Sequence, residues 1–294
     1  MMVKKVVICL FFCLASALEA PPRRRLYVVG CGVLGTAVAT EWLRRWPEAV
    51  VVTETKSERR HASLQELGCR PVLRGGRDQD GDYDAVLVCT PPSTYADGAE
   101  YAAEIREASK LLASPGKLVM ISSGGVFAED AGGRCDEESA VAETPRSAKL
   151  LEAERAALER GSVVRLAGLY KLDRGAHVVW LQKGTVQAKK DSLVNLLHYD
   201  DAASAAVNAL ERSERGRVYL AADMAPRTRE QIAESARRHP RFADFDPVTF
   251  TDGEPARGPK GKGRVYDCSR TMRDLDWKPK YPSIDDFFSS SADA

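Results

Sequence analysis

Three glycines that interrupt an apolar run are the residues whose spacing points most directly to chemistry. The run begins at Leu26, and Gly30, Gly32 and Gly35 end it at positions one, three and six. Where a strand turns into a helix, the first glycine permits a tight turn, the second lets a pyrophosphate approach the backbone, and the third lets the helix pack closely on the sheet. The N–H groups at the start of that helix would face the phosphates. The sequence therefore predicts a phosphate-binding turn at residues 30–35.

The segments on either side of the glycines agree with this prediction. Residues 36–43 have helical character, and a second apolar run follows at residues 49–53. Strand, helix and strand then form a βαβ unit of about 30 residues, the context that makes the glycine motif indicative of a dinucleotide. A fortuitous glycine turn is the alternative.

The residues after the second apolar run are those that distinguish the two nicotinamide dinucleotides. An acidic residue about 20 positions beyond the glycines would bind the ribose 2′-hydroxyl of NAD, and Glu54 stands at that distance. Basic side chains would instead accept the 2′-phosphate of NADP, and three are available: Lys56, Arg59 and Arg60. The alternative is a solvated helix start with Ser57 and Glu58 as capping residues. We expect NAD(P), with NADP slightly favoured.

Two later apolar segments end in residues that could line the same crevice. Residues 84–89 lead into Thr90 and Pro91, and residues 117–121 lead into Ser122 and Ser123. The carboxyl ends of parallel strands form the ligand crevice in open α/β sheets. An ordinary rigid turn at Thr90 and Pro91, and simple turn serines at 122 and 123, are the alternatives.

Length and charge limit the kind of partner. The chain has 294 residues, enough for one large α/β domain or for a nucleotide-binding domain with a smaller lobe. Lys and Arg number 43 and Asp and Glu 42, for a net charge of +1, so the overall balance favours neither nucleic acid nor a membrane surface. We expect a small-molecule substrate, no nucleic acid and no stable membrane anchor, with the oligomeric state unknown.

The first twenty residues are predicted to be a targeting segment. Lys4 and Lys5 precede an apolar run at residues 6–17, which ends in a small-x-small cleavage pattern and is too short to span a membrane. This pattern is typical of a signal peptide. Residues 15–21 also resemble the signal-to-transit junction of plastid proteins in algae with secondary plastids, although Leu18 replaces the aromatic residue of that motif. An endomembrane or secreted protein, or a cytosolic enzyme with a mis-assigned start, are the alternatives.

The cysteines indicate a reducing compartment and no metal site. Five lie beyond the targeting segment: Cys31, Cys69, Cys89, Cys135 and Cys268. Their number is odd, they are scattered, and they form no CxxC pair, which disfavours both a disulfide framework and a metal centre. Cytosol or stroma therefore fits better than the secretory lumen.

Four later segments carry a family resemblance. They are residues 119–127 with the two serines, 164–170 with Arg174, 196–203, and 216–223. In this order they resemble the extended and atypical short-chain dehydrogenases/reductases, the NAD-dependent epimerase/dehydratase group. The resemblance implies an α/β fold, with a Rossmann-type doubly wound parallel sheet at 21–175 and a small C-terminal substrate lobe at 176–294. We expect this lobe to be composite, with a helix near 202–211 that returns to the large domain.

The resemblance also implies a catalytic group. In the family a Ser or Thr polarises the substrate oxygen, a Tyr passes the proton, and a Lys four residues later holds the nicotinamide ribose and lowers the pKa of the tyrosine. Ser123 falls on the serine position and Lys149 on the lysine position, but Pro145 occupies the tyrosine position. Proline has no proton to give, so Tyr170, a water or Ser123 alone would have to replace the tyrosine.

Two hypotheses follow. The first is an NAD(P)-dependent oxidoreductase or epimerase-like enzyme that acts on a small hydroxyl or keto compound, which could be derived from a sugar or a nucleotide. The second is a non-catalytic NAD(P)-binding sensor or assembly factor that lacks the catalytic tyrosine.

The remaining candidate residues divide into three sets. Lys260, Lys262 and Arg264 could meet an anionic substrate or could simply be solvated. His198 and Asp201 are expected to be structural, Asp201 as the N-cap of a helix from Ala202. The residues expected to bind the cofactor are Gly30, Gly32, Val33, Leu34, Gly35, Glu54, Lys56, Thr90, Pro91, Ser122 and Lys149.

Overall fold

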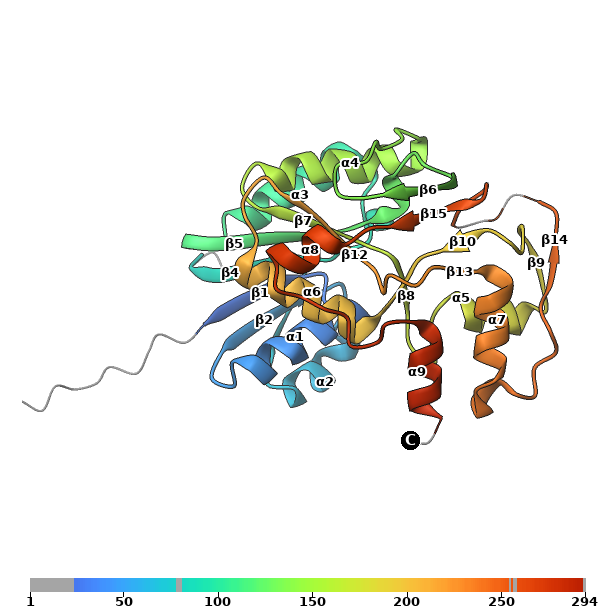
Figure 1. Ribbon diagram of the computed structural model, residues 1–294. Coiled ribbons are helices and arrows are strands. Elements are labelled where there is room, and N and C mark those ends of the chain that lie inside the picture. Colours follow the sequence, from blue (N-terminus) through green and yellow to red (C-terminus); the bar gives the residue numbers. More distant parts are fainter. Residues whose placement is uncertain (1–23, 78–80, 254, 256–257, 293–294) are drawn as a thin grey trace, which may run out of the picture.

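The computed structural model describes residues 24–77, 81–253, 255 and 258–292. The predicted targeting segment at residues 1–20 lies outside the described residues. In the described part of the chain, no helix is both long and apolar enough to cross a membrane. Figure 1 shows a layered α/β body, drawn mostly in blue to green, with a smaller lobe on one side.

The body is organised by one seven-stranded parallel sheet. Its strands lie in the order β12-β7-β5-β4-β1-β2-β3, and every pair is parallel. In that order they are Val218–Ala221, Ser162–Leu166, Leu112–Ser123, Tyr83–Val88, Arg25–Val29, Val50–Thr55 and Arg70–Leu73. Crossover connections carry the chain from one strand to the next, so the carboxyl ends of all the strands meet at one edge, beside the small lobe (Figure 1).

Helices cover both faces of this sheet. Leu26 and Val28 of β1 pack in the same cluster as helices α1 (Val33–Arg45) and α6 (Tyr199–Arg212). Tyr27 and Val29 point to the other face and pack with α3 (Gly98–Ser109) and α4 (Pro145–Leu158). A strand buried on both sides is continuously apolar, which explains the unbroken hydrophobic run before the glycines. The predicted doubly wound Rossmann-type fold is confirmed.

The remaining elements are short. One four-stranded sheet has the order β13-β10-β15-β6, and two strand pairs, β11-β8 and β14-β9, lie beside it. The strands, in chain order, are β6 Ala131–Cys135, β8 Gly168–Tyr170, β9 Thr185–Gln187, β10 Leu193–Val194, β11 Leu196–His198, β13 Arg227–Thr228, β14 Thr249–Thr251 and β15 Gly263–Tyr266. The helices are α2 His61–Glu66, α5 Ala176–Lys183, α7 Arg229–Arg237, α8 Ser269–Asp274 and α9 Ile284–Ser291. Because β15 pairs with β6, the late sequence is joined directly to the segment that follows β5.

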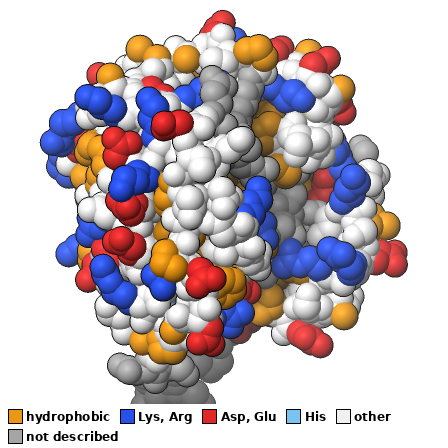
Figure 2. All heavy atoms as spheres, turned by 90° about the vertical axis from the view of Figure 1, so that its right-hand side faces the viewer, with side chains coloured by type: hydrophobic (Ala, Val, Ile, Leu, Met, Phe, Trp, Pro, Cys, Tyr) orange, Lys and Arg blue, Asp and Glu red, His pale blue; other side chains and the backbone are white. Residues whose placement is uncertain are grey.

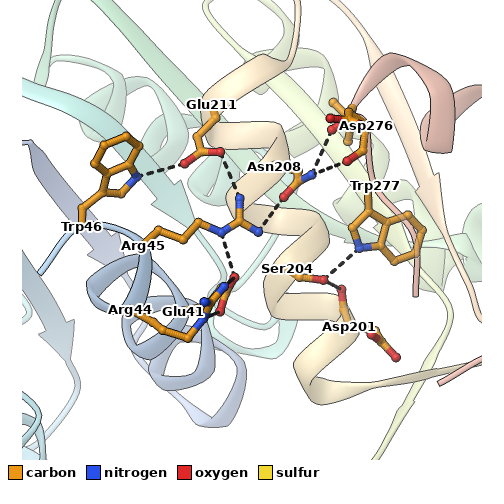
Figure 3. A network of polar contacts seen from close by, with 11 residues as sticks. Glu41, Arg44, Arg45, Trp46, Asp201, Ser204, Asn208, Glu211, Asp276 and Trp277 are labelled. Atoms are coloured by element: carbon orange, nitrogen blue, oxygen red, sulfur yellow. Dashed lines mark hydrogen bonds and ion pairs between the residues drawn. The ribbon is translucent and has the colours of Figure 1, made fainter. Parts of the chain in front are cut away.

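Helix α6 holds the C-terminal segment on the body. Asn208 donates to the carbonyls of Leu275 and Asp276, and Trp277 donates to Ser204, as Figure 3 shows. On its other side Asn208 accepts from Arg45 of α1. These contacts lie between α1, α6 and the chain after α8, so α6 serves as the anchor for both.

The start of α6 corrects one sequence prediction. We expected Asp201 to cap a helix from Ala202, but α6 begins at Tyr199 and its N-cap is His198, whose Nδ1 accepts from the Asp200 N–H at 3.2 Å. Asp201 instead accepts the backbone N–H groups of Lys280 and Tyr281. The carboxylate is drawn away from its own helix because the C-terminal segment offers two donors.

Three histidines lie in the aromatic core of the small lobe. His177 and His239 pack against Phe242 and Phe288, and His198 packs against Phe287. His177 is 1 % exposed, and its Nδ1 has no hydrogen-bond partner among the described residues. Burial lowers the pKa of His177 to about 4. The ring is therefore held neutral by its apolar surroundings.

We predict that His177→Leu raises the free energy of unfolding relative to wild type at acidic pH. The unfolded wild-type chain binds a proton at His177 below its ordinary pKa of about 6.5, whereas the folded chain does so only near pH 4. Stability is therefore lost as the pH falls through this window, and the substitution removes the loss. The difference between variant and wild type should grow by about 2 kcal/mol between pH 7.5 and pH 5 in denaturant titrations.

Val179→Leu, at the exposed neighbouring position on α5, is the matched control and should show a difference independent of pH. A pH-independent difference for His177→Leu as well would show that the buried ring is not held neutral.

Candidate functional site

The glycine turn has the geometry that its spacing predicts. Gly30 has φ +84°, a conformation that side chains with a Cβ rarely adopt, and a Cβ there would lie 2.9 Å from the backbone of Thr90. A Cβ on Gly35 would lie 3.1 Å from both Cys89 Sγ and Val28 Cγ1. The first glycine is thus required by the turn and the third by the close packing of α1 on the sheet.

Gly32 differs from its two neighbours because nothing lies within 4 Å of a Cβ built on it. It is the N-cap of α1, where no side chain caps the helix and the first turn contains no acidic residue. The first N–H groups of a helix have no partner within the helix, and here they belong to Val33, Leu34 and Gly35. Open space beside uncapped N–H groups fits a pyrophosphate.

Arg60 approaches this turn from the segment after β2. Its Nη1 donates to the carbonyl of Cys31 at 3.1 Å, and its Nη2 donates to Thr36 Oγ1 at 2.7 Å. Lys56 and Arg59 are exposed in the same segment. A cationic side chain therefore lies directly on the predicted phosphate-binding turn.

Glu54 lies at the end of β2 but is not free. It is 2 % exposed, and both of its carboxylate oxygens accept from Arg77, at 2.6 and 3.2 Å. Tyr27 also donates to it, at 3.2 Å. The carboxylate that the spacing assigned to the ribose is therefore covered by an arginine that follows β3. No pattern in the sequence points to Arg77, because it stands in a polar turn without periodicity.

The loop after β4 lies against the glycine turn. Thr90 is buried, hydrogen bonds through its hydroxyl to Tyr95, and backs Gly30 with its main chain. Pro91 is exposed beside it. Tyr95 stacks on Tyr101 with ring centroids 4.3 Å apart, which fixes the loop against α3.

The two serines at the end of β5 have different environments. Ser122 is buried and donates to Glu154, which forms a buried ion pair with Arg165. Ser123 is exposed, and its Oγ accepts the N–H of Gly125 at 3.1 Å. Of the pair, only Ser123 presents a hydroxyl at the carboxyl edge of the sheet, while Ser122 ties β5 to α4 and β7.

Lys149 and Pro145 lie on α4 above the same edge. Pro145 is the first residue of the helix, where a missing N–H has no cost, and Thr144 caps it. Lys149 Nζ donates to the carbonyls of Tyr95 and Ala96 at 2.6 and 2.8 Å. The lysine thus bridges α4 to the loop after β4, beside the crevice.

Tyr170 and Tyr266 are the two tyrosines relevant to the proton donor that is missing at position 145. Tyr170, which we considered as a replacement for the tyrosine, is wholly buried in the small lobe against His198 and Phe287. Tyr266 of β15 instead packs on Gly124, next to Ser123, and burial raises its pKa to about 12. No sequence pattern points to Tyr266, which is brought to the serine loop by the pairing of β15 with β6.

Basic residues of the small lobe are partly engaged. Arg264, which could have met an anionic substrate or been solvated, donates to the carbonyl of Phe127, whereas Lys262 is exposed. Figure 2, which faces the small lobe, shows Lys and Arg side chains interspersed with Asp and Glu. This face therefore carries charges of both signs. The described residues include no group of three or more side chains that could hold a metal ion.

The similarity of this chain to known proteins is found in its fold and not in its sequence. No protein-family model matches the sequence, and no curated protein matches it. A conserved protein of unknown function from Silicibacter pomeroyi has a TM-score of 0.75 at 18% identity, covering 92% of this chain and 99% of its own. The dTDP-glucose 4,6-dehydratase of Bacillus anthracis, in complex with NAD, has a TM-score of 0.72 at 16% identity, covering 92% and 96%.

UDP-glucuronic acid 4-epimerase from Bacillus cereus, also in complex with NAD, has a TM-score of 0.72 at 16% identity, covering 92% of this chain and 97% of its own. Identities this low establish a common fold and leave the chemistry to the residues of the site. The chain therefore has the fold of NAD-dependent epimerases and dehydratases, as the resemblance implied.

Proposed function

We propose that this protein is an NAD(P)-dependent oxidoreductase or epimerase-like enzyme that acts on a small hydroxyl or keto compound, of the kind found in sugar nucleotides. The observation that carries the proposal is the open space at Gly32 beside the uncapped N-terminus of α1. Gly30 and Gly35 are locked by close contacts, whereas Gly32 has none, as expected if a ligand rather than the protein fills that space. The complexes of proteins with the same fold contain NAD.

The chain's own residues divide the work. The main chain of Gly32 and the first turn of α1 would hold the pyrophosphate, and Thr90 would form the wall behind it. A bound nicotinamide supplies hydride transfer to or from a carbon atom of the substrate. Ser123 would hydrogen bond the oxygen on that carbon, since its hydroxyl is exposed at the carboxyl end of β5.

NADP is the favoured cofactor in this proposal. Arg60 lies on the glycine turn, and Lys56 is exposed at the end of β2, so two cations stand where a 2′-phosphate would enter. A phosphate on the ribose gains from such neighbours, whereas a free hydroxyl gains little.

A second function, non-catalytic sensing of NAD(P), is favoured by specific observations at α4. Pro145 offers no proton, and Lys149 is held by two carbonyls of the loop after β4. Both features preserve the cofactor crevice while removing the family's proton relay. Tight cofactor binding without turnover would identify this function.

For localisation we keep the proposal of a signal-bearing precursor, plastid-targeted or entering the endomembrane system. A fluorescent fusion of residues 1–25 should leave the cytosol in a cell with a secondary plastid. A fusion that stays in the cytosol would contradict the proposal and favour a mis-assigned start codon.

Gly32→Asp is predicted to lower NADPH affinity by about 100-fold or more, because it sets a carboxylate against the pyrophosphate. Folding should be preserved, since Gly32 has φ −83°, has space for a side chain, and is an N-cap position at which Asp is favourable. Fluorescence titration and a melting curve measure the two quantities. The neutral Gly32→Asn separates charge from size and should weaken binding less. Unchanged affinity in the Asp variant would remove the site.

Ser123→Ala should lower turnover by roughly 10²-fold, the scale expected for a positioned hydrogen-bond donor. The assay is NADPH oxidation and NADP reduction over a panel of carbonyl and alcohol compounds that includes UDP-sugars. NADPH affinity should stay at the wild-type value. Ser290→Ala on α9 is the control and should match wild type. A rate that does not depend on Ser123 would exclude it from the reaction, and no turnover by the wild type would favour the sensor.

A further inference from the structure

Glu54 and Arg77 form a paired site beneath the ribose end of the crevice. Arg77 Nε donates to Glu54 Oε2 at 2.6 Å, and Nη2 donates to Oε1 at 3.2 Å, so one guanidinium engages both oxygens. Tyr27 Oη donates to Oε2 from β1. Such a two-point contact between an arginine and a carboxylate is both strong and directional.

The two side chains of the pair are exposed to solvent to different degrees. The Glu54 side chain is 2% exposed and that of Arg77 is 18% exposed. Arg77 therefore covers the carboxylate and is itself the part that reaches solvent. Burial opposes the charge on Arg77, but the bonds to Glu54 and to Glu104 of α3 hold its pKa above the ordinary value.

Among the described residues, one further carboxylate contacts Arg77. Glu104 accepts from Arg77 and also lies 3.5 Å from Arg74, so this second acid is paired as well. Beyond the pair, the segment after β2 presents Lys56 and Arg60. A ligand that reaches the end of β2 therefore meets these cations and the exposed Glu58, while the carboxylate of Glu54 is covered by Arg77.

We propose that Arg77 is the specificity-determining residue of the cofactor site, because it neutralises the carboxylate of Glu54 that would otherwise favour NAD and repel the 2′-phosphate of NADP. Glu54 then serves as the anchor of Arg77 and not as a ribose ligand. This inference rests on the proposed function, since it concerns the same dinucleotide crevice.

The test is binding alone and needs no substrate. Dissociation constants for NADPH and NADH are measured by nicotinamide fluorescence for the wild type, Arg77→Met, Glu54→Gln and the double variant. The wild type should prefer NADPH. Arg77→Met should lower that preference by about tenfold or more, because an uncovered carboxylate faces the phosphate. The double variant should regain the preference, since the carboxylate is gone.

Further measurements distinguish this inference from other roles of Arg77 and Glu54. Arg106→Met, which removes an exposed arginine of α3 paired with Glu159, should leave the preference unchanged. Should Arg77→Met not fold, Glu54→Gln decides, since a selective loss of NADH affinity would show that Glu54 binds the ribose and would overturn the inference. A double variant that stays weak for NADPH would overturn it too, because Arg77 would then bind the phosphate itself. Failure of the wild type to bind either dinucleotide refutes the proposed function instead.

Discussion

The close approach of the glycine turn to the end of β4 is the contact on which the rest of the site depends. Cys89 Sγ donates to the carbonyl of Gly30 at 3.0 Å, and the main chain of Thr90 leaves no space for a Cβ on Gly30. These contacts fix where α1 begins, and hence where its uncapped N–H groups point. The proposed phosphate site would require this rigidity, because main-chain donors bind an anion well only when their positions are set beforehand.

Several acidic side chains of the body are paired with arginines, while Lys56 and Arg59 after β2 are exposed. Glu54, Glu104 and Glu154 are each held by an arginine, whereas Lys56 has no such partner among the contacts of the described residues. Glu54 of β2, Glu104 of α3 and Glu154 of α4 thus have their carboxylates covered by arginines. The segment after β2 therefore presents charges of both signs, from Lys56, Glu58 and Arg59, while the carboxylate of Glu54 is covered.

Local patterns were sufficient to predict the glycine turn and the parallel sheet, because chain spacing and alternation determine both. Ser123 could also be predicted, since it follows directly from a buried strand. Arg77 and Tyr266 could not, because each is placed by a strand pairing rather than by its neighbours in sequence: β3 on β2, and β15 on β6. The prediction that Asp201 caps α6 was wrong for the same reason. The backbone N–H groups of Lys280 and Tyr281, which are distant in sequence, donate to its carboxylate instead.

In the function proposed above, the turn at Gly32 holds a dinucleotide whose nicotinamide end lies beside Pro145. A crystal structure with NADPH tests this most directly. We predict that the pyrophosphate lies against Gly32 and the first turn of α1, and that Pro145 lies in the place of the family's tyrosine. A dinucleotide bound elsewhere, or a crevice empty in crystals grown with saturating NADPH, would contradict it.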